Sequence, residues 1–567
     1  MSVSETECEK GMVVYMMDFH DKVIYQIYPK SFMDSDGDGV GDLRGIIDKL
    51  DYLQYLGVDY IWLTPFFISP QRDNGYDVAD YRSVDAAFGN MEDLEELISQ
   101  ADGRGIGVML DMVFNHTSTE HEWFQRALKG EKEYMDYYIF KDGSSEHIPT
   151  NWESKFGGPS WEYVPNLGKW YLHLFDRTQA DLNWENPNVR EELKEVLRFW
   201  KRKGIKGFRF DVVNLISKPE VYEDDTEGDG RHFYTDRPHV HEFLQEIVRD
   251  AGIENMVTVG EMSSTSIASC IRYSNPDERE LSMCFNFHHL KVDYKDGNKW
   301  ELMPPDIQAL KRLFRQWQLG MQEHGGWNAV FWCNHDQPRI VSRFGDDGRY
   351  WKESAKMLAA SIHLLRGTPY IYQGEELGMT NPYFTHIGQY RDVESLNYYE
   401  ILLQEGKTKK EALQILASRS RDNGRTPMQW SSEPNAGFSG TTPWICVTNN
   451  YKQINAEAEK EDEASILAYY RKLIRLRKEK RAIADGKIDF LFEETPYLFA
   501  YRRYMECESA SGEELLVLNN LGKEPVVLDT AKLETDKYKL LLGNYEETKA
   551  GIPQVLRPYE SLLFEKF

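Results

Sequence analysis

Short apolar runs alternate with amphipathic stretches over most of the chain. The run at 23–28 is apolar and β-prone, and the stretches 43–56 and 91–102 carry apolar residues at helical spacing. Eight runs separated by helical patterns are predicted strands: 23–28, 60–63, 107–114, 207–213, 256–260, 284–287, 329–333 and 369–372. Strands that alternate with helices indicate βα units around a parallel sheet, and eight units predict an α/β fold, a (β/α)8 TIM barrel.

Two segments interrupt this alternation. Between 116 and 183 the sequence is irregular and aromatic, and an insertion of this length after the third strand predicts a small extra domain. After Asp485 the helical patterns give way to short β-prone runs, which predict an antiparallel β-sandwich: 488–490, 498–501, 515–518, 538–542 and 561–564. The predicted domains are a catalytic barrel (1–115 and 184–485), an inserted domain (116–183) and a C-terminal β-sandwich (486–567).

The charge balance narrows the classes of partner. The chain has 67 Lys and Arg against 93 Asp and Glu, a net charge of −26, which disfavours nucleic acid and anionic membranes. A small anionic substrate remains possible, because a few local cations can hold it and distant charges are screened over about 8–10 Å. The six scattered cysteines indicate a reducing compartment, and 1–19 lacks the pattern of a signal peptide. We therefore expect a cytoplasmic monomer that acts on a small molecule.

Three predicted strands lead into carboxylates. Asp211 follows GFRF, Glu261 follows VTVG, and Asp336 closes FWCNHD, while a fourth strand leads into Asn115-His116. Polar side chains at the C-terminal ends of barrel strands face the active site. A single carboxylate there more often caps a helix, but capping does not readily explain several on one barrel. Glycoside hydrolysis needs two carboxyl groups, one ionised for attack and one protonated for the leaving oxygen.

The neighbours of these groups predict which carboxyl takes which role. Arg209 lies two residues before Asp211 on the same strand face, and a nearby cation keeps a carboxylate ionised, as a nucleophile requires. Glu261 follows a glycine at an apolar strand end, where a raised pKa suits a general acid. His116 and His335 each stand in an Asn-His pair and are predicted to donate hydrogen bonds to sugar hydroxyls.

Several longer motifs are typical of one enzyme family. They are DMVFNH (111–116), QADLNW (179–184), GFRFDVVN (207–214), TVGEM (258–262) and FWCNHDQPR (331–339). With them, nearly the whole chain resembles the α-amylase family of glycoside hydrolases (GH13), whose architecture is the same barrel, insertion and C-terminal β-domain. The resemblance implies that Asp211 is the nucleophile, that Glu261 is the general acid/base, and that Asp336 binds substrate hydroxyls and favours ring distortion.

The same resemblance implies a closed pocket for one terminal glucose. In NGYDVADY it makes Tyr76 the stacking aromatic and Asp77 the aspartate that holds the non-reducing glucose. Arg421 in SRDNGRTP matches an arginine that closes the pocket, with Arg425 as the alternative. A closed pocket implies an exo-acting, retaining α-glucoside hydrolase with about 5–5.5 Å between its two catalytic carboxyl groups.

The choice of glucoside rests on fewer residues. Val212, after the nucleophile, resembles the residue of family members that act on α-1,6 or α,α-1,1 bonds, and Ala180 stands where oligo-1,6-glucosidases usually have proline. Longer segments resemble the family's trehalose-6-phosphate hydrolase branch: 149–158, 179–186, 228–236, 261–265 and 287–294. The resemblance implies that Lys291 binds the substrate's phosphate, with Lys299 as a second candidate. Oligo-1,6-glucosidase and sucrose isomerase activities are the alternatives.

An acidic loop near the start of the barrel predicts a metal site. Carboxylates recur at alternate positions around a turn at Gly39, although Gly45 stands where an EF-hand has its closing glutamate. The candidate ligands for a structural Ca²⁺ or Mg²⁺ are Asp34, Asp36, Asp38, Asp42 and the carbonyl of Val40. Relatives in the family carry Ca²⁺ in the matching loop, and no organic cofactor is expected.

Overall fold

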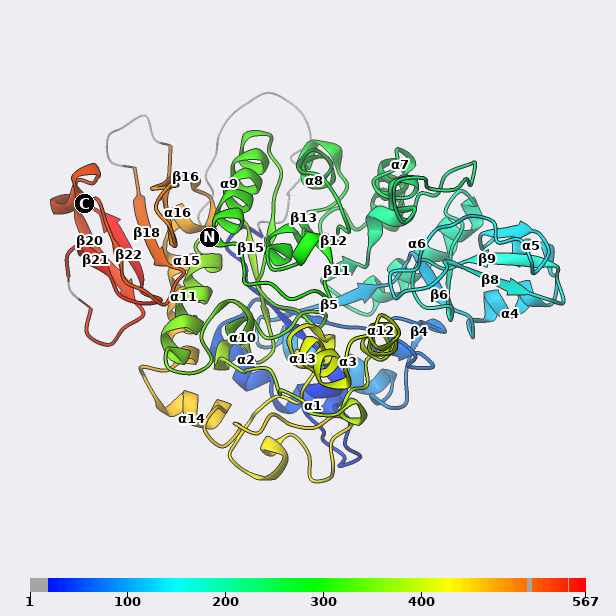
Figure 1. The fold of residues 1–567 in the computed structure, drawn as a ribbon, viewed down its shortest axis with the longest axis horizontal. Coiled ribbons are helices and arrows are strands. Elements are labelled where there is room, and N and C mark those ends of the chain that lie inside the picture. Colours follow the sequence, from blue (N-terminus) through cyan, green and yellow to red (C-terminus); the bar gives the residue numbers. More distant parts are fainter. Residues whose placement is uncertain (1–18, 507–511, 549) are drawn as a thin grey trace.

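The computed structural model describes residues 19–506, 512–548 and 550–567. All eight predicted barrel strands are present, with ends that differ from the prediction by a few residues (Figure 1). They are β1 (Ile24–Ile27), β2 (Tyr60–Leu63), β5 (Gly107–Met112), β11 (Gly207–Phe210), β12 (Val257–Glu261), β13 (Met283–Phe285), β14 (Ala329–Val330) and β15 (Thr368–Tyr372).

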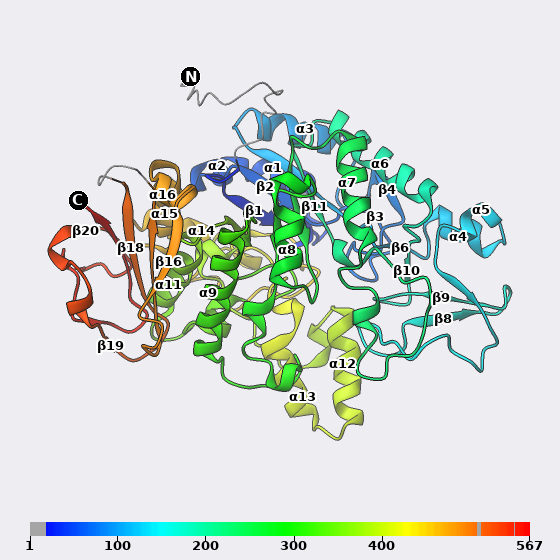
Figure 2. The ribbon, with the colours of Figure 1, turned by 90° about the horizontal axis from the view of Figure 1, so that it is seen from above.

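The eight strands form one parallel sheet that closes on itself. Their order is β13-β12-β11-β5-β2-β1-β15-β14, and a parallel bridge between Cys284 and Asn328 joins the two edges. The predicted (β/α)8 barrel is therefore confirmed. Helices surround the strands (Figure 2), among them α3 (Met91–Asp102), α6 (Pro187–Arg202), α7 (His239–Ala251), α8 (Ile267–Ser274), α9 (Ile307–Glu323), α11 (Trp351–His363) and α15 (Ile466–Glu479).

Local capping fixes where these helices begin. The predicted helix at 91–102 is α3, which starts at the capping box of Asn90 and Asp93. The predicted single helix at 43–56 is two helices, α1 (Leu43–Asp48) and α2 (Leu50–Leu56), because the backbone of Lys49 leaves helical geometry at ψ 6°. The carboxylate of Asp42 caps α1 by accepting a hydrogen bond from the Gly45 amide at 2.7 Å.

The segment predicted as an insertion leaves and re-enters the barrel on paired strands. Strand β6 (His116–Ser118) pairs antiparallel with β10 (Gln179–Asp181) at its base. Beyond this base it contains α4 (Glu122–Leu128), α5 (Lys132–Met135) and a three-stranded sheet of β7 (Phe140–Asp142), β9 (Lys169–Leu172) and β8 (Trp161–Val164). These elements project from one end of the molecule, at the right of Figure 1. The pairing of β6 with β10 brings His116 and Asp181 into register.

The predicted C-terminal strands form one antiparallel sheet at the opposite end. Its order is β16 (Lys487–Leu491), β17 (Leu498–Tyr504), β18 (Glu514–Asn520), β22 (Ser561–Lys566) and β20 (Tyr538–Gly543). One face packs on the barrel through α11 and α15, and β19 (Val526–Val527) with β21 (Val555–Leu556) covers the other. The second layer of the predicted sandwich is therefore only a two-stranded sheet.

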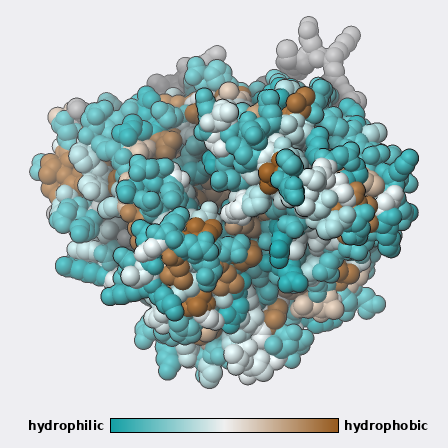
Figure 3. Space-filling view, turned by 45° about the vertical axis from the view of Figure 1, so that its right-hand side comes forward, coloured by the Kyte–Doolittle hydropathy of each residue, from teal (hydrophilic) through white to brown (hydrophobic). Residues whose placement is uncertain are grey.

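The structure describes four of the six cysteines and almost none of the N-terminal stretch on which the sequence analysis commented. Cys270, Cys284, Cys333 and Cys446 are free thiols, whereas Cys8 and Cys507 lie outside the described residues, as does nearly all of the N-terminal stretch 1–19. Among the helices of the described residues, none is long and apolar enough to cross a membrane. The face in Figure 3 is mostly hydrophilic, with small separate apolar patches.

The strand that leads to Asp211 should tolerate no side chain at its first residue. A Cβ added to Gly207 would lie 2.7 Å from the backbone oxygen of Val257 and 2.7 Å from the side chain of Met109. Gly207→Ala should therefore destabilise the barrel by about 1–3 kcal/mol, because neighbouring backbone must move. Gly551→Ala is the control, since nothing lies within 4 Å of its added Cβ. Equal melting temperatures for the two variants would contradict this reading.

Candidate active site

A single buried guanidinium joins the ends of three neighbouring strands. The register pairs Arg209 of β11 with Asp111 of β5, and β11 pairs in turn with β12, which ends at Glu261. Nη1 of Arg209 lies 2.6 Å from a carboxylate oxygen of Asp111 and 2.6 Å from one of Asp211. Nη2 contacts the carboxylate of Glu261. Arg209 therefore holds the predicted nucleophile and the predicted general acid on one planar group.

The sequence analysis expected Arg209 to act on Asp211 alone, so that Asp211 is ionised while Glu261 stays protonated. The structure does not support this reason. Arg209 contacts Glu261 as well as Asp211, so Glu261 does not stand in purely apolar surroundings. Burial opposes the charge of Arg209, but Asp111 and Asp211 more than offset it and raise its pKa further. The cation is therefore permanent, and because it contacts both catalytic candidates it does not distinguish them.

Exposure separates the carboxylates that can touch a substrate from the one that cannot. The side chain of Asp211 is 9% exposed and that of Glu261 is 14% exposed, whereas Asp111 is fully buried. Burial, opposed by Arg209 and assisted by Asp211, raises the pKa of Asp111 to about 7. Asp111 also accepts a hydrogen bond from the hydroxyl of Tyr76 at 3.0 Å. It is a structural partner that orients Arg209 and Tyr76.

His116 and His335 are neutral histidines that lie next to Tyr76. The ring of Tyr76 stacks on His335, with centroids 5.0 Å apart and planes 5° from parallel. Burial lowers the pKa of His335 to about 3 and also lowers that of His116. The side-chain nitrogen of Gln26 lies 2.8 Å from Nδ1 of His335, which places the ring proton on Nε2, 3.3 Å from Asp336. Both predicted histidines therefore lie in the site as neutral rings.

Asp336 lies beneath two arginines from a distant loop. It is six residues beyond the end of β14, so the predicted strand 329–333 ends earlier than expected. Its Oδ1 lies 2.7 Å from Arg425 and 3.3 Å from Arg421. Burial works against its charged form, but His335, Arg421 and Arg425 hold its pKa well below the usual range. Because His335 is neutral, the two arginines are the lasting cause.

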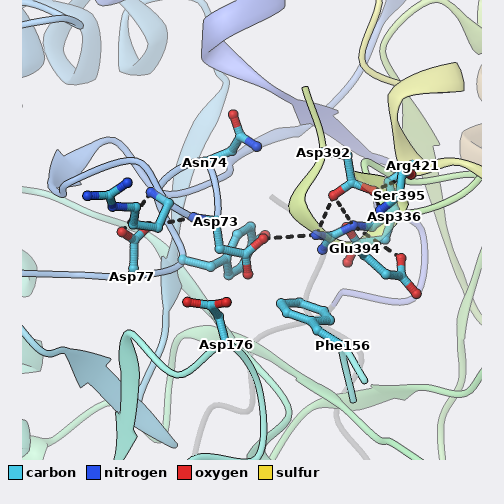
Figure 4. A network of polar contacts seen from close by, with 12 residues as sticks. Asp73, Asn74, Asp77, Phe156, Asp176, Asp336, Asp392, Glu394, Ser395 and Arg421 are labelled. Carbon is cyan, nitrogen blue, oxygen red and sulfur yellow. Dashed lines mark hydrogen bonds and ion pairs between the residues drawn. The ribbon is translucent and has the colours of Figure 1, made fainter. Parts of the chain in front are cut away.

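Asp73, an acid that the sequence analysis did not name, also lies beside Arg421. Oδ1 of Asp73 lies 2.9 Å from Arg421, and Figure 4 shows the two side chains joined across the pocket. Asp77, the predicted residue, is fully buried, and its carboxylate accepts hydrogen bonds from its own loop. The donors are the amide of Arg72 at 2.8 Å, the amide of Asp73 at 3.0 Å and the hydroxyl of Ser69 at 2.9 Å. Asp77 therefore shapes the loop that presents Asp73.

A signal for Asp73 was present in the motif itself. Asn74 and Gly75, at φ 49° and 103°, make a tight turn that brings Asp73 to the same side as Tyr76. Burial, opposed by Arg421 and Arg425, raises the pKa of Asp73 to about 7.

The residues chosen for substrate preference differ in exposure, since Val212 is buried and Lys291 is exposed. Lys291 ends the short helix η5 (His288–Lys291) and is exposed, whereas Lys299 is ion-paired with Glu394 at 2.7 Å and is thereby neutralised. Val212 is not a strand residue as predicted, because β11 ends at Phe210 and Val212 adopts φ 35°. A positive φ is unusual for a β-branched residue, so the turn after the nucleophile is strained.

The acidic loop brings three of its four predicted carboxylates together. Asp34, Asp36 and Asp42 offer oxygens that all lie within 4.8 Å of one another. Asp38 is outside this group, and its carboxylate instead accepts a hydrogen bond from the amide of Val40 at 2.7 Å. Loop amides and the Ser35 hydroxyl donate hydrogen bonds to Asp34 and Asp42 and so orient both carboxylates. Each carboxylate keeps further lone pairs that are available to a hard cation.

Comparison with known proteins agrees with this architecture. The catalytic-domain model of the α-amylase family matches residues 26–486, so the chain belongs to the α-amylase family of glycoside hydrolases. It is 54% identical to the trehalose-6-phosphate hydrolase of Escherichia coli strain K12, over 95% of this chain and 97% of that protein. It is 46% identical to an oligo-1,6-glucosidase of Parageobacillus thermoglucosidasius, over 96% and 98%. The solved structure of a Bacillus licheniformis trehalose-6-phosphate hydrolase mutant has a TM-score of 0.92 at 53% identity, covering 97% and 99%.

Substitution of the two neighbouring acids should separate their roles. Asp73→Asn removes a charge at the pocket, and hydrogen bonds to charged groups contribute about 1.5–3 kcal/mol each. It should lower kcat/KM about ten- to a hundredfold, and the loss in melting temperature should be small because Asp336 and Asp392 still contact Arg421. Asp77→Asn should lower the melting temperature, because loop amides lose an ionised acceptor. An Asp77→Asn protein of normal stability that loses more activity than Asp73→Asn would reverse the two assignments.

Proposed function

We propose that this protein is an exo-acting, retaining α-glucoside hydrolase that cleaves trehalose 6-phosphate into glucose and glucose 6-phosphate. The observation that carries the reaction is the pair Asp211 and Glu261, partly exposed and joined by Arg209. Support for the substrate comes from identities of 54% and 53% to trehalose-6-phosphate hydrolases over at least 95% of the chain.

The reaction follows from the two carboxyl groups. Asp211, ionised beside Arg209, attacks the anomeric carbon while Glu261 gives its proton to the oxygen that leaves with glucose 6-phosphate. A glucosyl-enzyme ester on Asp211 results. Glu261, now a carboxylate, takes a proton from water, and the resulting hydroxide attacks the same carbon and releases glucose with its configuration retained.

The ion pairs around Arg421 support a pocket for one terminal glucose. Asp73, Asp336 and Asp392 each contact Arg421, and the ring of Phe156 packs on its guanidinium at 4.8 Å. A wall of this kind blocks a longer chain on the non-reducing side, and its charged oxygens suit the hydroxyls of one sugar. The action is therefore on terminal glucose, with Asp336 and Asp73 as hydroxyl ligands.

Lys291 is the proposed phosphate ligand of the leaving sugar. It is a cation without an acidic partner among the described residues, whereas Lys299 is paired with Glu394. Oligo-1,6-glucosidase activity is the second candidate, since such enzymes are 46% identical. A cytoplasmic location and a monomeric state remain predictions.

The acidic loop is proposed to hold one Ca²⁺ through Asp34, Asp36 and Asp42, with the Val40 carbonyl as a further ligand. Carboxylate and carbonyl oxygens are the donors that Ca²⁺ prefers, and three carboxylates already converge. The hydroxyl of Ser439 donates to Asp34 at 2.5 Å, so a cation here would stabilise the contact between this loop and the segment around 439.

Kinetics on trehalose 6-phosphate, trehalose and isomaltose test the proposed substrate. The phosphorylated disaccharide should have the highest kcat/KM, and Lys291→Ala should raise its KM at least tenfold while isomaltose is unaffected. Asp211→Asn should lose at least about a thousandfold in kcat on every substrate, with a normal melting temperature. Faster cleavage of isomaltose would favour the second candidate instead.

Calcium removal tests the proposed metal site. Calcium at a hundred times its Kd should stabilise the folded protein by about 2.7 kcal/mol, seen as a higher melting temperature after chelator-treated protein is reloaded. Asp36→Asn should abolish this gain, whereas Asp38→Asn should keep most of it, because Asp38 lies outside the carboxylate cluster. A gain that persists in Asp36→Asn would place the ion elsewhere.

A further inference from the structure

Three cations from three separate loops influence one another beside the catalytic pocket. Lys155 belongs to the inserted segment, Arg231 opens the short helix η3 (Arg231–Phe233), and Lys291 ends η5. Burial, together with the charges of Arg231 and Lys291, lowers the pKa of Lys155 to about 8, although Asp229 acts in the opposite direction. Partial desolvation by its neighbours, together with the charge of Arg231, lowers the pKa of Lys291 as well.

Backbone contacts hold the first two cations in place. The amide of Glu153 donates to the carbonyl of Asp229 at 3.2 Å, and the amide of Lys155 donates to the carbonyl of Leu174 at 2.8 Å. Gly230 approaches Trp152 so closely that an added Cβ would lie 2.3 Å from the indole. The loops that carry Lys155 and Arg231 are therefore packed against each other.

The position of Lys155 connects this cluster with the chemistry. Its Nζ lies 5.2 Å from the centre of the Tyr234 ring, and Tyr234 belongs to the same buried cluster as Val212, the residue after the nucleophile. The next residue, Phe156, packs on Arg421 at the wall of the glucose pocket. Lys155 is thereby linked by packing to the turn after the nucleophile and, through its neighbour Phe156, to Arg421.

The cluster has more positive than negative charge. Asp229 accepts two hydrogen bonds from Arg231, of 2.8 and 2.6 Å, which leaves Nη1 of the guanidinium without an acceptor among the described residues. For Lys155 and Lys291, the described residues supply no ion pair. The hydroxyl of Tyr234 is fully buried and has no hydrogen-bond partner in the described chain. Three cations against one acid, in a chain of net charge −26, form a local site for a dianion.

We propose that Lys155 and Arg231 complete, with Lys291, the receptor for the phosphate of the leaving sugar. This rests on the proposed function, which assigns Lys291 alone. A phosphate dianion would relieve the repulsion among the three cations, with the guanidinium nitrogen that Asp229 leaves free and the two lysine ammonium groups as its donors. Asp229 orients Arg231, and the buried Tyr234 hydroxyl is a further donor.

The test compares a phosphorylated and a neutral substrate. Lys155→Gln and Arg231→Gln should each raise KM for trehalose 6-phosphate at least tenfold, with kcat changed less than threefold. Hydrolysis of p-nitrophenyl α-glucoside should stay within twofold of the wild type. Lys141→Gln is the matched control, because Lys141 also lies over a tyrosine ring, 4.0 Å from that of Tyr222, but burial alone shifts its pKa. Equal effects on both substrates, or none, would overturn the proposal.

Inhibition by glucose 6-phosphate distinguishes failure of this proposal from failure of the proposed function. Its Ki, measured with the neutral substrate, should rise at least tenfold in Lys155→Gln and Arg231→Gln, and Arg231→Lys should recover part of the loss. If only Lys291→Ala raises Ki, the proposed function stands and the wider receptor is wrong. If wild-type protein does not cleave trehalose 6-phosphate, the proposed function itself fails.

Discussion

One buried arginine is the interaction on which the rest of the site depends. Arg209 lies inside the barrel with no exposure, and a buried charge is tolerated only where partners compensate its lost hydration. Asp111, Asp211 and Glu261 are these partners, one from each of three neighbouring barrel segments. The strand register that pairs Arg209 with Asp111 therefore also sets the positions of the two groups proposed to carry out catalysis.

Around the pocket, a second buried arginine pairs with carboxylates that come from more distant segments of the chain. Arg421, in the short helix η9 (Arg421–Asn423), contacts Asp73 from the loop after β2 and Asp336 from the loop after β14. The pair of Arg421 with Asp73 joins positions 348 residues apart, so the pocket forms only when the barrel is closed. They also keep Asp336 ionised, which leaves its oxygens available as acceptors for sugar hydroxyls.

The proposed binding of an anionic substrate depends on the charges near the site and not on the net charge of the chain. The chain has a net charge of −26, yet the rim near Lys155 carries more cations than acids. Screening over about 8–10 Å makes the distant acids weak there, and ion pairing removes Lys299 as a free charge. In the proposed receptor the contribution of the insertion is a single loop, which packs against the barrel loop around Gly230.

The sequence by itself determined the barrel and its principal carboxylates. Eight apolar runs gave the eight strands because buried parallel strands need continuous apolar residues, and the motifs around Asp211 and Glu261 located the strand ends. Short-range signals were less complete: they missed the break at Lys49 and the left-handed turn at Val212.

Only the tertiary structure decided which partner each charged side chain meets. Asp73 and Asp77 are equally acidic in sequence, but loop amides take up the carboxylate of Asp77 while Arg421 meets Asp73. Lys291 and Lys299 are likewise equivalent in sequence until Glu394 pairs with one of them. The physical reason is common to both cases: the role of a charged side chain depends on the partners that long-range contacts bring to it, and these do not follow from local residue pattern.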